Sequence, residues 1–479
     1  MTKTFDNYID GRWAPGADRI SNINPSDVSD SVGAFATADA DEARQAVAAA
    51  AGAARAWART PASVRAEILE RAGNELTARR EELGDLLARE EGKTLPEGIG
   101  EVARAGAIFR YQAQQAVRSP GELLESVRPG IEIAVTHEPL GPVTIITPWN
   151  FPIAIPAWKI APALAYGNTV IFKPAELVPG CAWQLVDILQ RAGLPAGVLN
   201  LVMGRGSVVG DILTGSPEIA GVSFTGSTAT GQRVLESATS HRARVQLEMG
   251  GKNPLIIADD ADLATAVNVA IQGSYFSTGQ RCTASSRLLV MRGILDRFQS
   301  ALIEGLDALV VGDARAKGTD LGPVVDAGQL AQDERYLELA RGTGRVHGGE
   351  RLARGTEGFY LSPALILDAG NDDVCSREEI FGPVASIIAV DDYDQAVDVA
   401  NDTEFGLASG IVTTSLARAN DFRRRSEAGM VMVNLPTAGV DYHVPFGGRK
   451  ASSYGTREQG EYAREFYTNV KTSYVSASL

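Results

Sequence analysis

The fold class is decided by a run of short apolar segments: PVTII (142–146), TVIF (169–172), VLNLV (198–202), GVSF (221–224), PLIIA (254–258) and RLLVM (287–291). Each segment is rich in β-branched or aliphatic residues, and stretches of helical length lie between them. Strands that alternate with helices predict βαβ units and a parallel sheet. One series precedes Gly250 and the other follows it, so we expect an α/β protein built from two such series.

The chain before Glu132 has a different character. Short strand-like segments fill the first 30 residues or so, and an alanine-rich helical stretch begins at Asp41. Apolar residues recur at helical spacing from Val64 to Leu76, so one face of that segment is expected to be buried. The helical pattern continues, with breaks, to about Arg118.

Length and composition exclude several classes of protein. The 479 residues suggest two or three domains, and 44% hydrophobic with 22% charged residues is typical of an ordinary globular chain. The formal net charge of −14 argues against nucleic acid as the main partner, because phosphate binding needs clustered lysine and arginine.

Cysteines and apolar stretches bear on the compartment. Cys181, Cys282 and Cys375 are too few and too dispersed for a disulfide framework, and none has zinc-ligand spacing, so no metal is expected. The N-terminal MTKTFDNYID lacks the apolar core of a secretory signal. The most apolar stretch, 151–166, is shorter than the roughly 20 residues that span a bilayer. We therefore expect a cytoplasmic protein without a membrane partner.

Three residues could carry nucleophilic chemistry. Cys282 follows a small polar loop that can expose its thiol, and the neighbouring Arg281 could favour the thiolate. Glu248 precedes a glycine pair and could activate water. Asn150 follows PVTII and could donate to an oxyanion. Taken singly, each is more simply explained as a structural cysteine, a surface acid or a turn asparagine.

Two further segments could contact a nucleotide. Lys173 and Glu176 follow TVIF, and ligands of open parallel sheets bind beyond the strand ends. Gly226 and Gly231 lie in FTGSTATG, a turn before a helix whose N-terminus would suit a pyrophosphate. Neither segment is specific alone. The first is equally a solvated Lys/Glu pair, and the second is neither GxGxxG nor a P-loop.

Together, the order and spacing of these motifs agree with one family. The motifs are TPWNFP (147–152), FKPAE (172–176), FTGS (224–227), LEMGGKNP (247–254), GQRCT (279–283), EEIFGPV (378–384), NDTEFGLASG (401–410) and PFGGRKAS (445–452). Over nearly its whole length the chain resembles the NAD(P)-dependent aldehyde dehydrogenase superfamily.

The resemblance implies oxidation of an aldehyde to the free carboxylic acid. Cys282 would be the nucleophile, Glu248 the general base and Asn150 an oxyanion donor. Members that pass the acyl group to coenzyme A lack this glutamate, so its presence favours hydrolysis. A thiol esterase and a non-catalytic binding protein on the same fold are the distant alternatives.

The cofactor implied is NAD, with NADP possible. A glutamate at position 176 tends to repel a 2′-phosphate, which favours NAD. The residues that match cofactor contacts of the family are Trp149, Lys173, Glu176, Gly226, Ser227, Gly231, Glu379 and Phe381.

The substrate implied is a small or medium aldehyde in an aromatic tunnel. Arg281 could bind a distal carboxylate. The segment 434–455 resembles members that oxidise 2,5-dioxopentanoate, whereas succinate semialdehyde or a broad range of aldehydes is the alternative. Ser453 stands where common members have glycine. The residues that match the tunnel are Phe151, Ile155, Trp158, Arg281, Thr283 and Phe446.

The resemblance also implies a division of the chain. We expect a Rossmann-like NAD(P)-binding domain from 1–118 and 140–250, and an α/β catalytic domain from 251–450. Residues 119–139 and 451–479 would form a small β oligomerisation element. Its exposed edge would need a second subunit to cover it, so a homodimer or homotetramer is expected.

Overall fold

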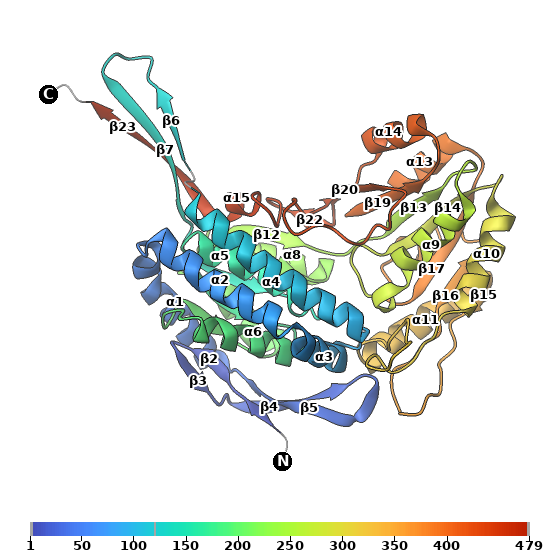
Figure 1. The fold of residues 1–479 in the computed structure, drawn as a ribbon, viewed down its shortest axis with the longest axis horizontal. Coiled ribbons are helices and arrows are strands. Elements are labelled where there is room, and N and C mark those ends of the chain that lie inside the picture. Colours follow the sequence, from blue (N-terminus) through green and yellow to red (C-terminus); the bar gives the residue numbers. More distant parts are fainter. Residues whose placement is uncertain (1–2, 119–120, 477–479) are drawn as a thin grey trace.

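The chain folds into two α/β bodies, with a β arm that projects from the first of them (Figure 1). The computed structural model describes residues 3–118 and 121–476. Each body contains its own mainly parallel sheet, and the chain crosses from the first sheet to the second after Glu248. The predicted α/β fold class is confirmed.

The first sheet carries the earlier series of apolar segments. Its strands lie in the order β22 (Ser453–Tyr454), β12 (Arg244–Glu248), β11 (Gly221–Thr225), β8 (Pro142–Ile146), β9 (Thr169–Lys173), β10 (Leu199–Leu201), β2 (Asn7–Ile9) and β3 (Arg12–Ala14). Neighbours from β12 to β10 pair in parallel. Antiparallel β22, β2 and β3 lie at its two ends.

Helices pack around this sheet and close its core. They are α1 (Ala40–Ala58), α2 (Ala62–Ala78), α3 (Arg80–Glu91), α4 (Leu95–Val117), α5 (Ala154–Ala165), α6 (Pro179–Arg191), α7 (Gly206–Gly215) and α8 (Thr228–Thr239). Every residue of α5 is buried, because the helix is almost wholly apolar and its one charged residue, Lys159, is ion-paired to Glu458. In the described ranges, no helix combines the length and the apolar character that a membrane crossing requires.

The second sheet carries the later series of segments. Its strands lie in the order β15 (Arg345–Gly348), β16 (Ala364–Leu367), β17 (Val384–Val390), β14 (Ser285–Met291), β13 (Asn253–Ile257), β19 (Ala408–Val412) and β20 (Met430–Val433). All neighbours pair in parallel except β15 and β16. The helices of this body are α9 (Leu263–Ser274), α10 (Leu295–Asp307), α11 (Ala327–Thr343), α12 (Val374–Arg377), α13 (Tyr393–Asn401) and α14 (Leu416–Arg425).

The projecting arm joins distant parts of the chain. It consists of β6 (Gly121–Glu125), β7 (Ile131–Pro139) and β23 (Thr468–Ser476), with β7 in the middle (Figure 1). Leu123, Val470 and Val475 are exposed on it. Residues 119–120 and 477–479 of the expected oligomerisation element lie outside the described residues. The role of the arm in assembly stays a prediction.

Smaller elements complete the fold. These are the sheet of β1 (Thr4–Phe5), β5 (Asp27–Thr37) and β4 (Asp18–Asn24), the pair β18 (Phe405–Gly406) and β21 (Arg449–Lys450), the turn η1 (Phe276–Gly279) and α15 (Ala463–Tyr467).

The candidate site lies where the carboxyl ends of the first sheet face the second body. The segment 147–150 follows β8, Gly226 follows β11 and Met249 follows β12, so the three lie at one edge. Cys282 precedes β14 of the second sheet, and residues of both bodies line the same pockets.

Candidate active site

Cys282 lies in a wall shared by two pockets. The first, which we call the aromatic pocket, has a cavity volume of about 220 Å³, and the second, the strand-end pocket, has about 200 Å³. A thiol in a common wall can meet one ligand from each side.

The loop that presents Cys282 has an unusual backbone. Ser277, Thr278 and Gly279 all have positive φ, at 53°, 55° and 67°. Non-glycine residues rarely adopt this conformation, and it persists only where surrounding contacts hold it. A Cβ at Gly279 would lie 2.1 Å from the carbonyl oxygen of Gly382, so only glycine fits there. The polar loop predicted to expose the thiol is thus a tightly held turn.

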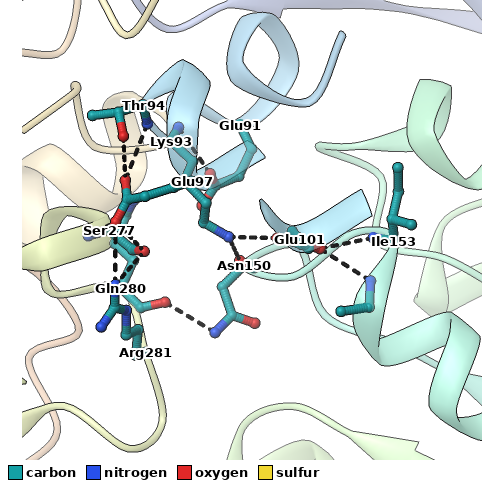
Figure 2. Close-up of polar contacts among 11 residues, drawn as sticks. Glu91, Lys93, Thr94, Glu97, Glu101, Asn150, Ile153, Ser277, Gln280 and Arg281 are labelled. Atoms are coloured by element: carbon teal, nitrogen blue, oxygen red, sulfur yellow. Dashed lines mark hydrogen bonds and ion pairs between the residues drawn. The ribbon is translucent and has the colours of Figure 1, made fainter. Parts of the chain in front are cut away.

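Glu97 on α4 is one of the groups that hold this turn (Figure 2). Its Oε1 accepts hydrogen bonds from the Ser277 N–H at 2.8 Å, the Ser277 hydroxyl at 2.9 Å and the Arg281 guanidinium at 3.1 Å. Its Oε2 accepts from the Thr94 hydroxyl at 2.8 Å. The first turn of α4 and the cysteine loop therefore share one carboxylate.

Glu101, one helical turn further on, holds the asparagine loop (Figure 2). It accepts from Lys93 Nζ at 2.7 Å and from two backbone N–H groups at the start of α5, each at 3.0 Å. The same ammonium donates to the Asn150 carbonyl oxygen at 2.7 Å. The Asn150 amide donates to the Gln280 carbonyl oxygen at 2.9 Å. Asn150 is thus fixed by α4 on one side and by the cysteine loop on the other.

Any favourable effect of Arg281 on the Cys282 thiolate is outweighed by other groups. Burial and the carboxylates of Glu379 and Glu248 raise the pKa of Cys282 above its ordinary value. The Arg281 guanidinium is bound to Glu97 and Ser277 instead. The thiolate is therefore disfavoured, and the thiol must lose its proton before it attacks.

Glu248 is not a surface acid. It ends β12 and is 2% exposed, and burial together with the nearby Glu458 raises the pKa of Glu248 well above its ordinary value. It accepts a hydrogen bond from Ser453 at 2.5 Å. Its neighbour Met249 lines the strand-end pocket. A buried carboxyl with a raised pKa binds a proton more readily than a solvated one, which is a property that a general base needs.

Residues predicted to hold the cofactor gather in the strand-end pocket, namely Trp149, Gly226, Ser227, Glu379 and Phe381, together with Asn150 and Cys282. The rings of Trp149 and Phe381 meet edge to face, with centroids 5.4 Å apart. Burial raises the pKa of Glu379 to about 7, and its Oε1 accepts from the Gly251 N–H at 2.8 Å.

The remaining predicted cofactor residues lie beyond the lining of this pocket. Lys173 ends β9, and Glu176 accepts from the Gly206 N–H at 3.2 Å. Lys173 is buried, so the solvated-pair alternative is wrong for it, whereas Glu176 is exposed. Gly231 lies in α8, where a Cβ would meet the sulfur of Met249 at 2.5 Å, so its absence of a side chain serves packing.

The aromatic pocket brings together every residue predicted for the tunnel, namely Phe151, Ile155, Trp158, Arg281, Thr283 and Phe446. It also contains residues of α4 and the turn before it that the sequence did not reveal, namely Lys93, Glu97, Gly100, Glu101 and Arg104. They lie in an ordinary helical pattern without a motif. The only feature of the sequence that could have pointed to them is the three- and four-residue spacing of their charges, which is equally typical of a solvent-exposed helix face.

The charges of this pocket pair off, with one exception. Lys93 is bound to Glu101, and Arg281 to Glu97. In the described part of the chain, Arg104 has no ion-pair partner within 4.0 Å, and its buried Nε has no hydrogen-bond partner. Burial lowers the pKa of Arg104, and more distant carboxylates offset this only in part. The guanidinium stays charged, so it leaves an uncompensated cation at the pocket wall.

Arg104 has two neighbours that orient it. Its Nη2 donates to Gln459 Oε1 at 3.1 Å, and its guanidinium lies 5.9 Å from the centre of the Trp158 ring. Across residues 3–118 and 121–476, no group of three His, Cys, Asp or Glu side chains is placed to hold a metal ion.

Replacement of Lys93 tests the buried network. Lys93→Met leaves Glu101 buried without its cation, which should destabilise the protein by about 3–5 kcal/mol and lower its melting temperature in a thermal scan. Arg292→Met breaks an ion pair whose side chains are each 64% exposed, and it should shift the melting temperature little. Equal shifts for both variants would contradict this account of the network.

Known proteins share this sequence and fold. The family model described as Aldehyde dehydrogenase family matches residues 13–473. An alpha-ketoglutaric semialdehyde dehydrogenase of Bacillus subtilis is 42% identical, with 98% of each chain covered. A 2,5-dioxopentanoate dehydrogenase of Saccharolobus solfataricus is 39% identical over 98% of this chain and 99% of its own. A betaine aldehyde dehydrogenase of Staphylococcus aureus, solved in complex with NAD+, superposes with a TM-score of 0.95 at 32% identity, covering 99% of this chain and 95% of that one. The chain therefore belongs to the aldehyde dehydrogenase family, as the resemblance of its motifs predicted.

Proposed function

We propose that this protein oxidises a small anionic semialdehyde, first of all 2,5-dioxopentanoate, to the free carboxylic acid with NAD. The observation that carries the proposal is the position of Cys282 in the wall between two pockets. One pocket has the groups that suit a dinucleotide, and the other is apolar with a single unpaired cation. The relatives named above support the same activity.

The residues of the strand-end pocket would hold NAD. Gly226 and Ser227 precede α8, whose N-terminal N–H groups suit a pyrophosphate. Trp149, Glu379 and Phe381 would surround the nicotinamide riboside. Lys173 and Glu176 would meet the adenosine ribose, as the sequence resemblance implies, and the carboxylate of Glu176 favours NAD over NADP. When bound, the oxidised nicotinamide accepts a hydride from the substrate.

Cys282 would act first. Its thiol releases its proton to solvent, and the sulfur adds to the aldehyde carbon. The Asn150 amide and the Cys282 N–H then donate to the new oxyanion. One such donor is worth on the order of 3 kcal/mol. Asn150 can serve because Lys93 and Gln280 already fix its position.

Glu248 would act second. After oxidation the acyl group is held as a thioester on Cys282. Glu248 takes a proton from water, the hydroxyl oxygen adds to the thioester carbon, and the carbon–sulfur bond breaks. The free acid leaves and Cys282 is restored. A carboxyl whose pKa burial raises above its ordinary value is a stronger proton acceptor than a solvated one.

Arg104 would anchor the far end of the substrate. Phe151, Trp158 and Phe446 give the aromatic pocket apolar walls for a short carbon chain. Arg281, which the sequence suggested for the carboxylate, is already neutralised by Glu97. We therefore move this role to Arg104, because a partly buried guanidinium without a carboxylate partner is stabilised by an anionic ligand.

The wider assignments complete the proposal. Residues 1–118 and 140–250 would form the cofactor domain, and 251–450 the catalytic domain. The arm would join subunits into a homodimer or homotetramer through its exposed strand edge. The three cysteines are free thiols, which suits a reducing compartment such as the cytoplasm.

Replacement of Arg104 tests the substrate class. Arg104→Met should lower kcat/KM for 2,5-dioxopentanoate by about 10- to 100-fold, since a charge-assisted hydrogen bond is worth about 1.5–3 kcal/mol. Pentanal, which lacks the carboxylate, should change by less than about threefold. Arg104→Lys keeps the charge and should retain part of the preference. An equal loss for both aldehydes would rule out Arg104 as the anchor.

Replacement of Glu248 tests the order of events. Glu248→Gln should release about one equivalent of reduced nicotinamide per site in a rapid-mixing trace. Steady turnover should then fall by at least about 100-fold, because general base catalysis contributes about 10²–10⁴. Cys282→Ala should give no burst, and Cys181→Ala, at a buried thiol away from the pockets, should behave as the parent enzyme. Unimpaired steady turnover of Glu248→Gln would refute its role as base.

A further inference from the structure

Ser453 faces Glu248 directly in the first sheet. The two residues are partners in the antiparallel ladder between β22 and β12. Residues directly opposite in a ladder project from the same face, with Cβ atoms about 4.5–5.5 Å apart. The pairing register therefore delivers a hydroxyl to the carboxyl group, independently of any flexible loop.

The contact between Ser453 and Glu248 uses one carboxyl oxygen and, within the described ranges, leaves the other without a hydrogen-bond partner. Ser453 Oγ donates to Glu248 Oε2 at 2.5 Å and accepts from the Gly448 N–H at 2.6 Å. Because Gly448 occupies the hydroxyl as an acceptor, its own hydrogen points to Glu248. Glu248 Oε1 is buried and has no hydrogen-bond partner in the part of the chain that the structure describes. A Cβ at Gly447 would lie 2.7 Å from that oxygen, so the backbone limits it on one side.

Among the described residues, no charged group near Glu248 forms a comparable hydrogen bond with its carboxyl. Glu458 raises the pKa of Glu248, but Glu458 itself is ion-paired to the buried Lys159. Lys159 and Arg457 lower the pKa of Glu248 through space, and Glu248 in turn raises the pKa of Cys282. Ser453 is the only hydrogen-bond donor to the carboxyl among the described residues.

We propose that Ser453 is a positioning residue for deacylation: it holds Glu248 Oε2, so that Oε1 is the oxygen that takes the proton from water. The inference rests on the proposed role of Glu248 as general base. It gives a function to the serine that replaces the glycine of the common motif, since glycine would leave both oxygens unanchored. A hydrogen bond to an ionised carboxylate also stabilises its basic form.

The test follows the acyl-enzyme directly. The enzyme is mixed with one equivalent of 2,5-dioxopentanoate and excess NAD, quenched in acid, and the decay of the acyl adduct is measured by intact-protein mass spectrometry between about pH 6 and pH 9. Ser453→Ala should slow decay about tenfold at neutral pH. Loss of the hydrogen bond raises the pKa of Glu248, so the acid limb of the profile should move to higher pH and the rate should recover above it.

Matched variants separate positioning from structural damage. Ser453→Thr keeps the hydroxyl on a residue that suits a strand and should restore the parent profile. Ser453→Gly provides a second variant without the hydroxyl if Ser453→Ala fails to fold. The burst of reduced nicotinamide should keep its amplitude in all three, because formation of the thioester does not use the Ser453 contact.

Two results would overturn the inference, and they are distinguishable. If Glu248→Gln blocks deacylation while Ser453→Ala or Ser453→Gly keeps the parent pH profile, the positioning role of Ser453 is wrong and the proposed function stands. If Glu248→Gln leaves deacylation intact, the base assignment fails and the role of Ser453 fails with it.

Discussion

Two carboxylates, one helical turn apart on α4, fix the relative positions of the reactive groups of this site. Glu97 binds the loop that carries Cys282, and Glu101 binds the segment that carries Asn150 and the start of α5. The cysteine belongs to the second body and the asparagine to the first, so their relative position depends on this shared helix. The spacing of an α-helix thereby fixes the distance between a nucleophile and the donor expected to stabilise its product.

The same constraint shapes the electrostatics of the aromatic pocket. Carboxylates used to hold loops need cations beside them, and Lys93 and Arg281 supply these. The structural ion pairs therefore consume two of the three cations that line the pocket. Arg104 has no such ion-pair partner among the residues that the structure describes, so the wall of the pocket carries one unpaired positive charge. The chain as a whole, with its formal net charge of −14, gives no hint of this.

The sequence predicts the α/β class and most of the site, because strands at regular spacing and loops at strand ends leave local patterns. Cys282, Asn150 and the tunnel residues are recognisable in this way. Arg104 is not recognisable in this way. Its proposed role depends on the absence of a neighbouring carboxylate, and ion pairs between distant segments leave no pattern in the local sequence. For the same reason the sequence does not reveal that the Arg281 guanidinium is bound to Glu97.

The burial of Glu248 was equally hard to foresee. A short strand that ends in a glutamate before a glycine pair is typical of an exposed turn, but the late strand β22, some 200 positions along the chain, pairs with it. The pairing of β12 with β22 is a long-range contact, whereas sequence patterns report neighbours. Residues whose properties arise from such pairing, Glu248 and Ser453 among them, therefore need the structure.

The wall shared by the two pockets has a consequence for chemical intervention. An electrophilic inhibitor that bonds to the Cys282 sulfur can be extended into either cavity, so one warhead supports two independent families of compounds. Extensions toward Arg104 would use an acidic group, which the unpaired guanidinium can bind. Extensions toward Ser227 would use nucleotide-like groups that suit the strand-end pocket. The chemistry of such a compound thus depends on the side of the thiol from which it is grown.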